Sequence, residues 1–575
     1  MTAGHHPLDL VLVWHFHQPD YRDLATGEFR LPWTYLHALK DYSDMAWHLE
    51  QHPQVRAVVN FVPVLVDQLE DYVRQFDSGE LRDPLLRLLV RPSATPLTVS
   101  ERATILERCF HANHQHMIRP FAAYRGLHEL FDLASNQGSD SLAYLSDQYL
   151  YDLVTWYHLA WTGETVRRGS ELVTRLMSAG RRFSDDDRRA FGALIGEVMR
   201  GIVPRYRRLA ERGQIELSAT PHHHPLAPLL IDFASARDAE PQAALPRAAA
   251  YPGGAERVAF HIDSAIAAHA QRFGARPHGM WPAEGAVSAP LLRLYGERGL
   301  AWIASGERVL ARSVARARGA APPREEYLYR PWRTPDVAPE LVCFFRDDRL
   351  SDLIGFEYKS WDGRDAAANF VAELERIATQ GAAKGGARPL VSAILDGENA
   401  WEWYAYNGYY FLDALYSALG AHKAIRTTTY RAWLEAHRRR GASRAPVDAL
   451  PAIAAGSWVH GSFSTWIGSH DKNRAWDLLA AAKQCFDLVV ASGRLDAERS
   501  RAAFAQLAAC EASDWFWWFG DYNPPEAVAS FDQLYREKLA RLYALLNLPA
   551  PEELAKPISR GSGHPEAGGA MRRAS

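Results

Sequence analysis

Short apolar runs alternate with helical segments along most of the chain. Six runs have the character of buried strands: residues 8–14, 55–65, 215–220, 301–305, 341–347 and 390–397. Between them, stretches such as 290–300 and 365–380 carry apolar residues three and four positions apart, the spacing of an amphipathic helix. This alternation indicates a parallel sheet covered by helices, either a (β/α) barrel or a doubly wound sheet.

Two regions depart from this alternation. Residues from about 85 to 212 are almost wholly helical in pattern, which predicts a helical insertion between strands. A helical pattern returns after a linker at 438–457 and continues to about residue 547. We therefore expect an α/β domain in residues 1–420, a helical C-terminal domain in 421–550 and a disordered tail in 551–575.

Composition and charge narrow the possible partners. The chain has 575 residues, a formal net charge of −3 and a pI near 6.8, so no overall positive field favours nucleic acid or an anionic membrane. We find no apolar run near the roughly 20 residues that a membrane helix needs, and no signal peptide pattern, so we expect a cytoplasmic protein. The four cysteines are widely spaced and are expected to be buried, reduced thiols.

Aromatic residues are numerous, with 18 Trp and 24 Tyr. Sugar rings stack on such side chains, and the Trp N–H and Tyr O–H groups can bond sugar hydroxyls. A Trp-rich core explains the same counts equally well. The composition therefore suggests a carbohydrate ligand without deciding for it.

Polar residues collect where the apolar runs end, which is where parallel α/β folds bind ligands. The first run ends with His15 and His17 on one face of an extended segment, and Gln18 follows. The third run contains Glu216 and leads into three histidines, of which we expect His224 to reach the site. Glu216 is a charged residue within an apolar strand, which tends to mark a polar site.

Two further acids follow strand-like segments and stand near tryptophans. Glu284 lies after Trp281, upstream of a helix start, and Asp396 ends the last run, two residues before Glu398. Asp396 as the N-cap of a following helix is the alternative. Two separated acids at strand ends are what glycosidic cleavage requires, because one group attacks or stabilises the anomeric carbon and the other protonates the leaving oxygen.

Five motifs together resemble glycoside hydrolase family 57, in the order that this family shows. They are HQP (17–19), GQIEL (213–217), GMWPAEGAVS (279–288), ILDGENAW (394–401) and a Trp-rich segment (457–479). Segments 345–358 and 511–521, and the WPAEGAVS form, are similar to the amylase and amylopullulanase branch of that family.

The resemblance implies a (β/α)7 barrel followed by a helical domain that contributes to the active site, and retaining action on α-1,4-glucans. It implies Glu284 as nucleophile and Asp396 as general acid/base. We expect no metal and no cofactor. The substrate-binding candidates are His15, His17, Gln18, Glu216, His224, Trp281, Asp352, Glu398, Trp401, Trp458, Trp466 and Asp514.

Other functions remain open at this stage. A 4-α-glucanotransferase or a branching enzyme would use the same glycosyl-enzyme intermediate. A metal-dependent carbohydrate deacetylase also fits histidines and acids at strand ends, although we recognise no histidine pair four residues apart with a neighbouring acid in a metal-binding pattern. A non-catalytic glucan-binding protein would not need both acids. The oligomeric state is not indicated.

Overall fold

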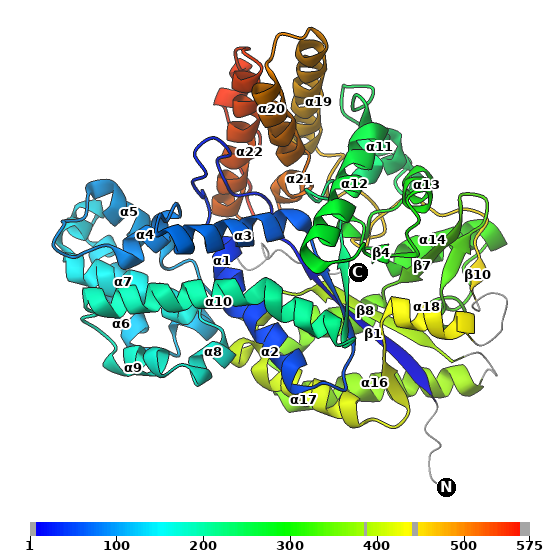
Figure 1. The fold of residues 1–575 in the computed structure, drawn as a ribbon, viewed down its shortest axis with the longest axis horizontal. Helices are drawn as coiled ribbons and strands as arrows, with labels where there is room; N and C mark the ends of the chain where they lie inside the picture. Colours follow the sequence, from blue (N-terminus) through cyan, green and yellow to red (C-terminus); the bar gives the residue numbers. More distant parts are fainter. Residues whose placement is uncertain (1–6, 384–387, 440–446, 564–575) are drawn as a thin grey trace.

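A mainly parallel β-sheet forms the centre of the computed structural model, which describes residues 7–383, 388–439 and 447–563 (Figure 1). Seven parallel strands lie in the order β8 (Leu390–Asp396), β1 (Leu8–Phe16), β2 (Ala57–Phe61), β3 (Ile215–Ala219), β4 (Gly279–Met280), β5 (Trp302–Ser305) and β7 (Ala338–Phe345). The end strands approach each other where the backbone N–H of Asp347 donates to the carbonyl of Ser392 at 2.8 Å. With its outer helices, this is a (β/α)7 barrel, as predicted.

Every one of the six apolar runs contains a strand of this barrel. The seventh, β4, is two residues long and gives no recognisable pattern. Three short strands extend the sheet: β6 (Trp332–Thr334) is antiparallel to β7, β10 (Asp448–Ala449) pairs with β6, and β9 (Ile425–Thr427) pairs with β1.

Outer helices cover the barrel because alternate strand residues face them. Leu10 and Leu12 of β1 belong to the large core shared with the helices, whereas Val11 and Val13 belong to a smaller apolar cluster in the barrel interior. The covering helices are α1 (Trp33–His37), α2 (Ser43–Gln51), α3 (Pro63–Ser78), α12 (Gly254–Phe273), α13 (Ala289–Glu297), α14 (Glu307–Arg318), α16 (Gly363–Ala383) and α17 (Tyr409–Ala421).

Helix α18 (Tyr430–Arg439) closes one end of the barrel, because Tyr430, Trp433 and Leu434 pack into the interior cluster. Thus β9 and α18 lie within the barrel, although they follow residue 420, where we expected the first domain to end. The predicted boundary between the first domain and the helical C-terminal domain at residue 420 stays a prediction.

The helical insertion lies between β2 and β3. It contains α4 (Pro84–Val90), α5 (Val99–Arg108), α6 (Ala122–Asn136), α7 (Asp147–Ala160), α8 (Glu164–Gly169), α9 (Glu171–Ala179) and α10 (Asp185–Glu211). The long α10 starts with a capping box in which Ser184 and Asp187 bond each other's backbone N–H. In Figure 1 these helices form the left side of the molecule.

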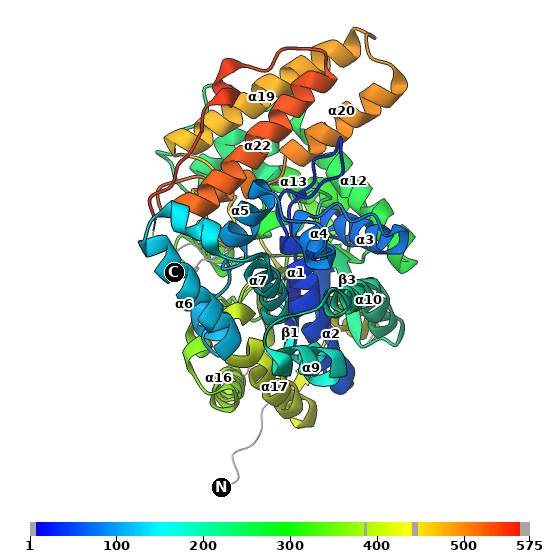
Figure 2. The same cartoon turned by 90° about the vertical axis from the view of Figure 1, so that its left-hand side faces the viewer.

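A second helical group follows the barrel: α19 (His470–Ala491), α20 (Ala497–Cys510), α21 (Asp514–Trp518) and α22 (Pro525–Leu545). Figures 1 and 2 both show α19, α20 and α22 packed together above the barrel. Of the tail expected to be disordered, Glu552–Ala555 form a 3₁₀ helix, and residues 564–575 lie outside the described residues.

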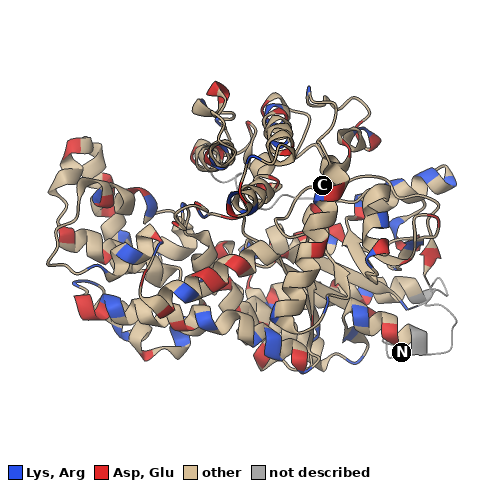
Figure 3. Ribbon diagram, turned by 45° about the horizontal axis from the view of Figure 1, so that its top comes forward, with Lys and Arg blue, Asp and Glu red and all other residues tan. Residues whose placement is uncertain are grey.

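Charges of both signs are mixed along the helices (Figure 3). All four cysteines are unpaired, and Cys109, Cys343 and Cys510 are buried while Cys485 is half-buried. Within the described ranges, every helix is too short or too polar to cross a membrane.

Candidate active site

A cavity of about 1170 Å³ lies at the carboxyl ends of the barrel strands. Glu284 and Asp396 both line it, together with residues that follow β1 and β7. Its walls come from outside the barrel: Phe110 and Phe131 from the insertion, and Trp517 and Phe531 from the C-terminal helices, are examples. The barrel thus supplies the polar floor, and the two helical regions supply much of the apolar wall.

Glu284 is held by its backbone and by a tryptophan. It lies in a short 3₁₀ turn (Ala283–Gly285) with a left-handed φ of 58°, a conformation that costs a non-glycine residue about 1 kcal/mol or more. Trp458 donates its indole N–H to Glu284 Oε2 at 3.0 Å and its backbone N–H to the Glu284 carbonyl at 3.1 Å. These two bonds hold the backbone and the carboxylate of Glu284 in place.

Asp396 lies at the end of β8 in an environment that favours its protonated form. Burial is the main cause that raises its pKa, to about 6, and Asp514 raises the pKa further. A 3.1 Å hydrogen bond from Asn399 and the charges of His17 and Arg346 act in the opposite direction and lower it. Asp396 thus accepts a hydrogen bond from a side chain of its own loop. The helix-cap alternative gains no support, since the next helical turn, η9 (Trp401–Trp403), starts later.

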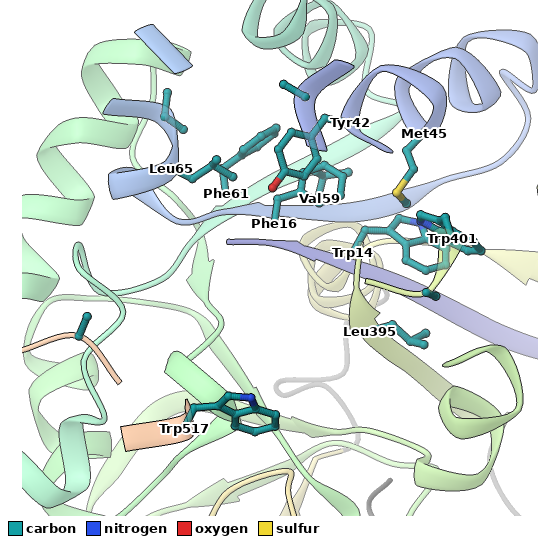
Figure 4. Packing of buried hydrophobic residues seen from close by; sticks show 14 of the residues in the cluster. Trp14, Phe16, Tyr42, Met45, Val59, Phe61, Leu65, Leu395, Trp401 and Trp517 are labelled. Atoms are coloured by element: carbon teal, nitrogen blue, oxygen red, sulfur yellow. The ribbon is translucent and has the colours of Figure 1, made fainter. Parts of the chain in front are cut away.

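The loop after Asp396 is pressed against β1. A Cβ at Gly397 would lie 2.0 Å from Cε1 of Phe16, so only glycine fits there. The Gly397 N–H donates to the His15 carbonyl at 2.7 Å, and its carbonyl accepts from the Trp401 indole at 2.7 Å. Figure 4 shows Trp401 beside Trp14.

Three histidines are stacked in the cavity. The ring centroids of His17 and His224 lie 3.8 Å apart, and those of His15 and His224 lie 5.2 Å apart. Burial, and then the charge of His17, lower the pKa of His15 to about 3, so its imidazole is neutral. Since Asn60 Oδ1 accepts from His15 Nδ1 at 2.7 Å, His15 Nε2 keeps a lone pair.

The other two histidines are bonded to the C-terminal region. His17 Nε2 donates to both carboxylate oxygens of Asp514 at 2.9 Å, and His224 Nδ1 hydrogen bonds with Ser513 Oγ at 3.0 Å. His224 also lies 4.0 Å from Glu284 Oε1. Among the described residues, His17 Nδ1 and His224 Nε2 are buried without a partner, so both are available to a ligand.

His17, His224 and Asp514 could also hold a metal, because one potential ligand atom of each, a ring nitrogen or a carboxylate oxygen, lies within 4.8 Å of the others.

Glu398 holds the start of the β1 loop instead of contacting Asp396. Its Oε1 accepts from the His17 backbone N–H at 3.0 Å, from Gln18 Nε2 at 3.3 Å and from the Tyr42 hydroxyl at 3.3 Å. Burial, and then the charge of Asp396, raise its pKa well above the usual range. A protonated Glu398 therefore lines the cavity as a neutral donor and acceptor.

Arg346 is a cavity residue that the sequence analysis missed. It follows β7, lies with its guanidinium 5.4 Å from the centre of the Trp458 ring, and donates to Asp348 at 2.7 Å and Asp352 at 2.8 Å. Asp352, expected to bind substrate, is outside the cavity lining and acts on Arg346. The signal was present in the FRDD segment directly after the strand, because a buried arginine needs such acids.

Glu216 is not brought to the cavity, which corrects the expectation from its strand position. Its carboxylate accepts from the Trp302 indole at 2.7 Å and from the Arg431 backbone N–H at 2.9 Å, near the end of the barrel that α18 closes. Burial raises its pKa, and these two donors oppose that rise. The hydrogen bonds of this buried carboxylate are thus made within the protein, away from the cavity.

Three predicted tryptophans support the site from behind. Trp281 is fully buried, and its ring centroid lies 5.1 Å from that of Trp458. Trp401 donates its indole N–H to the Gly397 carbonyl. The ring centroid of Trp466 lies 5.7 Å from that of Trp517. None of the three lines the cavity, and their predicted contact with substrate stays a prediction. The predicted residues that do line the cavity are Glu284, Asp396, His15, His17, Gln18, His224, Glu398, Trp458 and Asp514.

A buried ion pair fixes the C-terminal segment that carries Asp514. Glu511, directly after α20, accepts from Arg257 at 2.7 Å through both oxygens and from His261 at 2.7 Å, both on α12. Burial opposes ionisation of Glu511, but Arg257 and His261 lower its pKa to about 2. Beside it, an isolated bridge pairs Pro225 with Ala512.

The sequence matches the family model for glycosyl hydrolase family 57 over residues 11–446. A search of the curated proteins found no match.

Solved structures resemble this one at low sequence identity. A branching enzyme from Thermococcus kodakaraensis has 16% identity and a TM-score of 0.57, with 94% of this chain and 90% of that chain covered. A branching enzyme from Pyrococcus horikoshii has 14% identity and a TM-score of 0.57, with 99% of each chain covered. The α-amylase AmyC from Thermotoga maritima has 13% identity and a TM-score of 0.55, with 94% and 93% covered. These likenesses establish the shared fold.

Replacing Glu511 by Ala should lower the free energy of unfolding by about 3–5 kcal/mol, because Arg257 and His261 would stay buried without their carboxylate. Guanidinium unfolding followed by tryptophan fluorescence measures the change. Glu498→Ala, on the exposed side of α20, is the control and should alter stability by less than about 0.5 kcal/mol. Equal midpoints for the two variants would refute the anchoring role of Glu511.

Proposed function

The chain belongs to glycosyl hydrolase family 57, and we propose on this basis that it cleaves α-1,4-glucans with retention of configuration, in the manner of an amylase or amylopullulanase. The observation that carries the proposal is the pair of carboxyl groups in one cavity. Glu284 accepts a hydrogen bond from Trp458, whereas the pKa of Asp396 is raised to about 6. A nucleophile and an acid are thereby distinguished by their surroundings.

In the first step, Glu284 attacks the anomeric carbon and Asp396 gives its proton to the departing glycosidic oxygen. The left-handed backbone and the Trp458 bond hold Glu284 in place for this attack. The product is a glycosyl ester of Glu284, and the released sugar carries the proton of Asp396.

In the second step, the ionised Asp396 takes a proton from water, which attacks the anomeric carbon and frees Glu284. Arg346 and His17 contribute positive charge near Asp396, which favours this ionised state. The neutral imidazoles of His15 and His224 offer hydrogen bonds to sugar hydroxyls without adding charge. Trp458 and Trp517 provide aromatic surface for neighbouring sugar rings.

Glycosyl transfer is the second candidate, and the size of the cavity favours it. Its volume of about 1170 Å³ exceeds the range of about 300–1,000 Å³ typical of small-molecule pockets, which leaves room for several sugar units. Since the insertion and the C-terminal helices both line it, a second glucan chain can bind as acceptor in place of water. A 4-α-glucanotransferase or a branching enzyme would work in this way.

Glu284→Gln should lower kcat on maltoheptaose by at least about a thousandfold, and Asp396→Asn by about 10²–10⁴-fold, because each removes one of the two reacting groups. Reducing-end release measures both. Glu297→Gln, an exposed change on α13, is the matched control. Activity near that of the unchanged protein in either site variant would exclude this assignment.

The pH dependence should report Asp396. Because its proton is needed for the first step, kcat/KM should fall about tenfold per pH unit above a pKa near 6. Asp514→Asn removes a negative charge that raises this pKa, so the alkaline limb should move to lower pH. Initial rates between pH 4 and 9 with a chromogenic maltooligosaccharide test this, and an alkaline limb that does not move in Asp514→Asn contradicts it.

Products from maltoheptaose distinguish hydrolysis from transfer. An amylase yields only shorter saccharides, because water is the acceptor. Transfer yields saccharides both longer and shorter than maltoheptaose, and branching adds α-1,6 linkages detectable by isoamylase digestion of amylose products. Chromatography with pullulan as a parallel substrate also tests the amylopullulanase type, and a product set dominated by longer chains would overturn the hydrolytic proposal.

A further inference from the structure

Two histidines and an aspartate meet between α2 and α17, at a place that the catalytic proposal does not use. His48 lies in α2, His52 directly follows that helix, and Asp413 lies in α17. One atom of each offers a metal ligand, and these atoms lie within 4.8 Å of one another. These two histidines, four residues apart, form no recognisable metal motif in the sequence, because their acid comes from a distant part of the chain.

His48 is fully buried, and neither of its ring nitrogens has a hydrogen-bond partner among the described residues. Burying an unpaired polar group lowers the stability of a protein, so a ligand for this imidazole would explain its position. Its neighbours are the rings of Trp47 and Tyr409, with centroids 5.1 and 5.2 Å away.

The other two groups already have a suitable spacing. His52 Nε2 lies 3.1 Å from Asp413 Oδ1. Ligands at 2.0–2.2 Å from a tetrahedral Zn²⁺ are about 3.3 Å apart, so this pair fits as it stands and His48 has to approach by about 1.5 Å at most. The Asp413 side chain is 47% exposed, which gives a cation an entry route and a water for the fourth position.

We propose that His48, His52 and Asp413 bind one divalent cation of the zinc type, which links α2 to α17 outside the active-site cavity. Two imidazoles and one carboxylate suit Zn²⁺ and its transition-metal neighbours and not Mg²⁺ or Ca²⁺, which prefer oxygen ligands. The two helices follow the strands that carry the histidines and Asp396, since α2 comes after β1 and α17 after β8. The cation stabilises the packing behind both catalytic loops and takes no part in the reaction.

The experiment measures Zn²⁺ binding to the full chain after EDTA treatment and desalting. Isothermal titration with ZnCl₂ should give one site that His52→Gln and Asp413→Asn each weaken by at least about tenfold, since loss of an outer-shell partner alone costs that much. Both positions are partly exposed, so these variants should keep the fold, which circular dichroism checks. His470→Gln removes an exposed histidine and should leave the affinity unchanged.

Co²⁺ absorption and thermal melting provide independent readouts. Tetrahedral Co²⁺ bands should appear in the unchanged protein and in His470→Gln and be lost in the two site variants. Zn²⁺ should raise the melting temperature only where the bands appear. A chain that takes up no Zn²⁺ overturns the proposal, and so does binding of equal affinity in His52→Gln and Asp413→Asn, which would place the cation elsewhere, for example at His17, His224 and Asp514.

Discussion

The buried ion pair of Glu511 with Arg257 and His261 determines how the C-terminal helices meet the barrel, and through this contact it determines which groups form the active site. Burying a carboxylate costs several kcal/mol, and bidentate bonding to an arginine with further donors offsets that cost. Such a pair tolerates little displacement, because an ångström of movement would leave charges unpaired. The next residues along the chain are Ser513 and Asp514, which reach His224 and His17.

The two carboxyl groups in the cavity differ because different parts of the fold surround them. The Glu284 carboxylate receives an indole N–H from Trp458 and lies 4.0 Å from the neutral His224. Asp396 is buried close to Asp514, so a second negative charge is unfavourable there. The raised pKa of Asp396 therefore depends mainly on its burial at the end of β8, and Asp514 of the C-terminal segment adds a smaller contribution.

Local patterns in the sequence were sufficient for a parallel sheet covered by helices and for two candidate acids at strand ends, whereas the choice of a (β/α)7 barrel came from the resemblance to a family. Continuous apolar runs mark buried parallel strands, and acids at their ends mark a site. They were insufficient for side chains whose partners are distant in the chain. The Glu216 carboxylate bonds Trp302 and the Arg431 backbone and does not reach the cavity. The neighbouring residues in the sequence do not show whether a strand side chain points to the cavity or to the opposite end of the barrel. Tryptophans that line the cavity and tryptophans that support it are likewise alike in sequence.

The division between floor and walls bears on the choice between hydrolysis and transfer. The floor is fixed by strand pairing and by buried hydrogen bonds, so its chemistry has little freedom to vary. The walls are helices held mainly by apolar packing, which accepts substitutions when volume is kept. In the proposed mechanism, both acceptors, water and a sugar hydroxyl, react with the same ester of Glu284 and use the same base. What differs is whether the walls hold a second chain long enough to exclude water, and this is a property of the insertion and of α21 and α22, not of the catalytic pair.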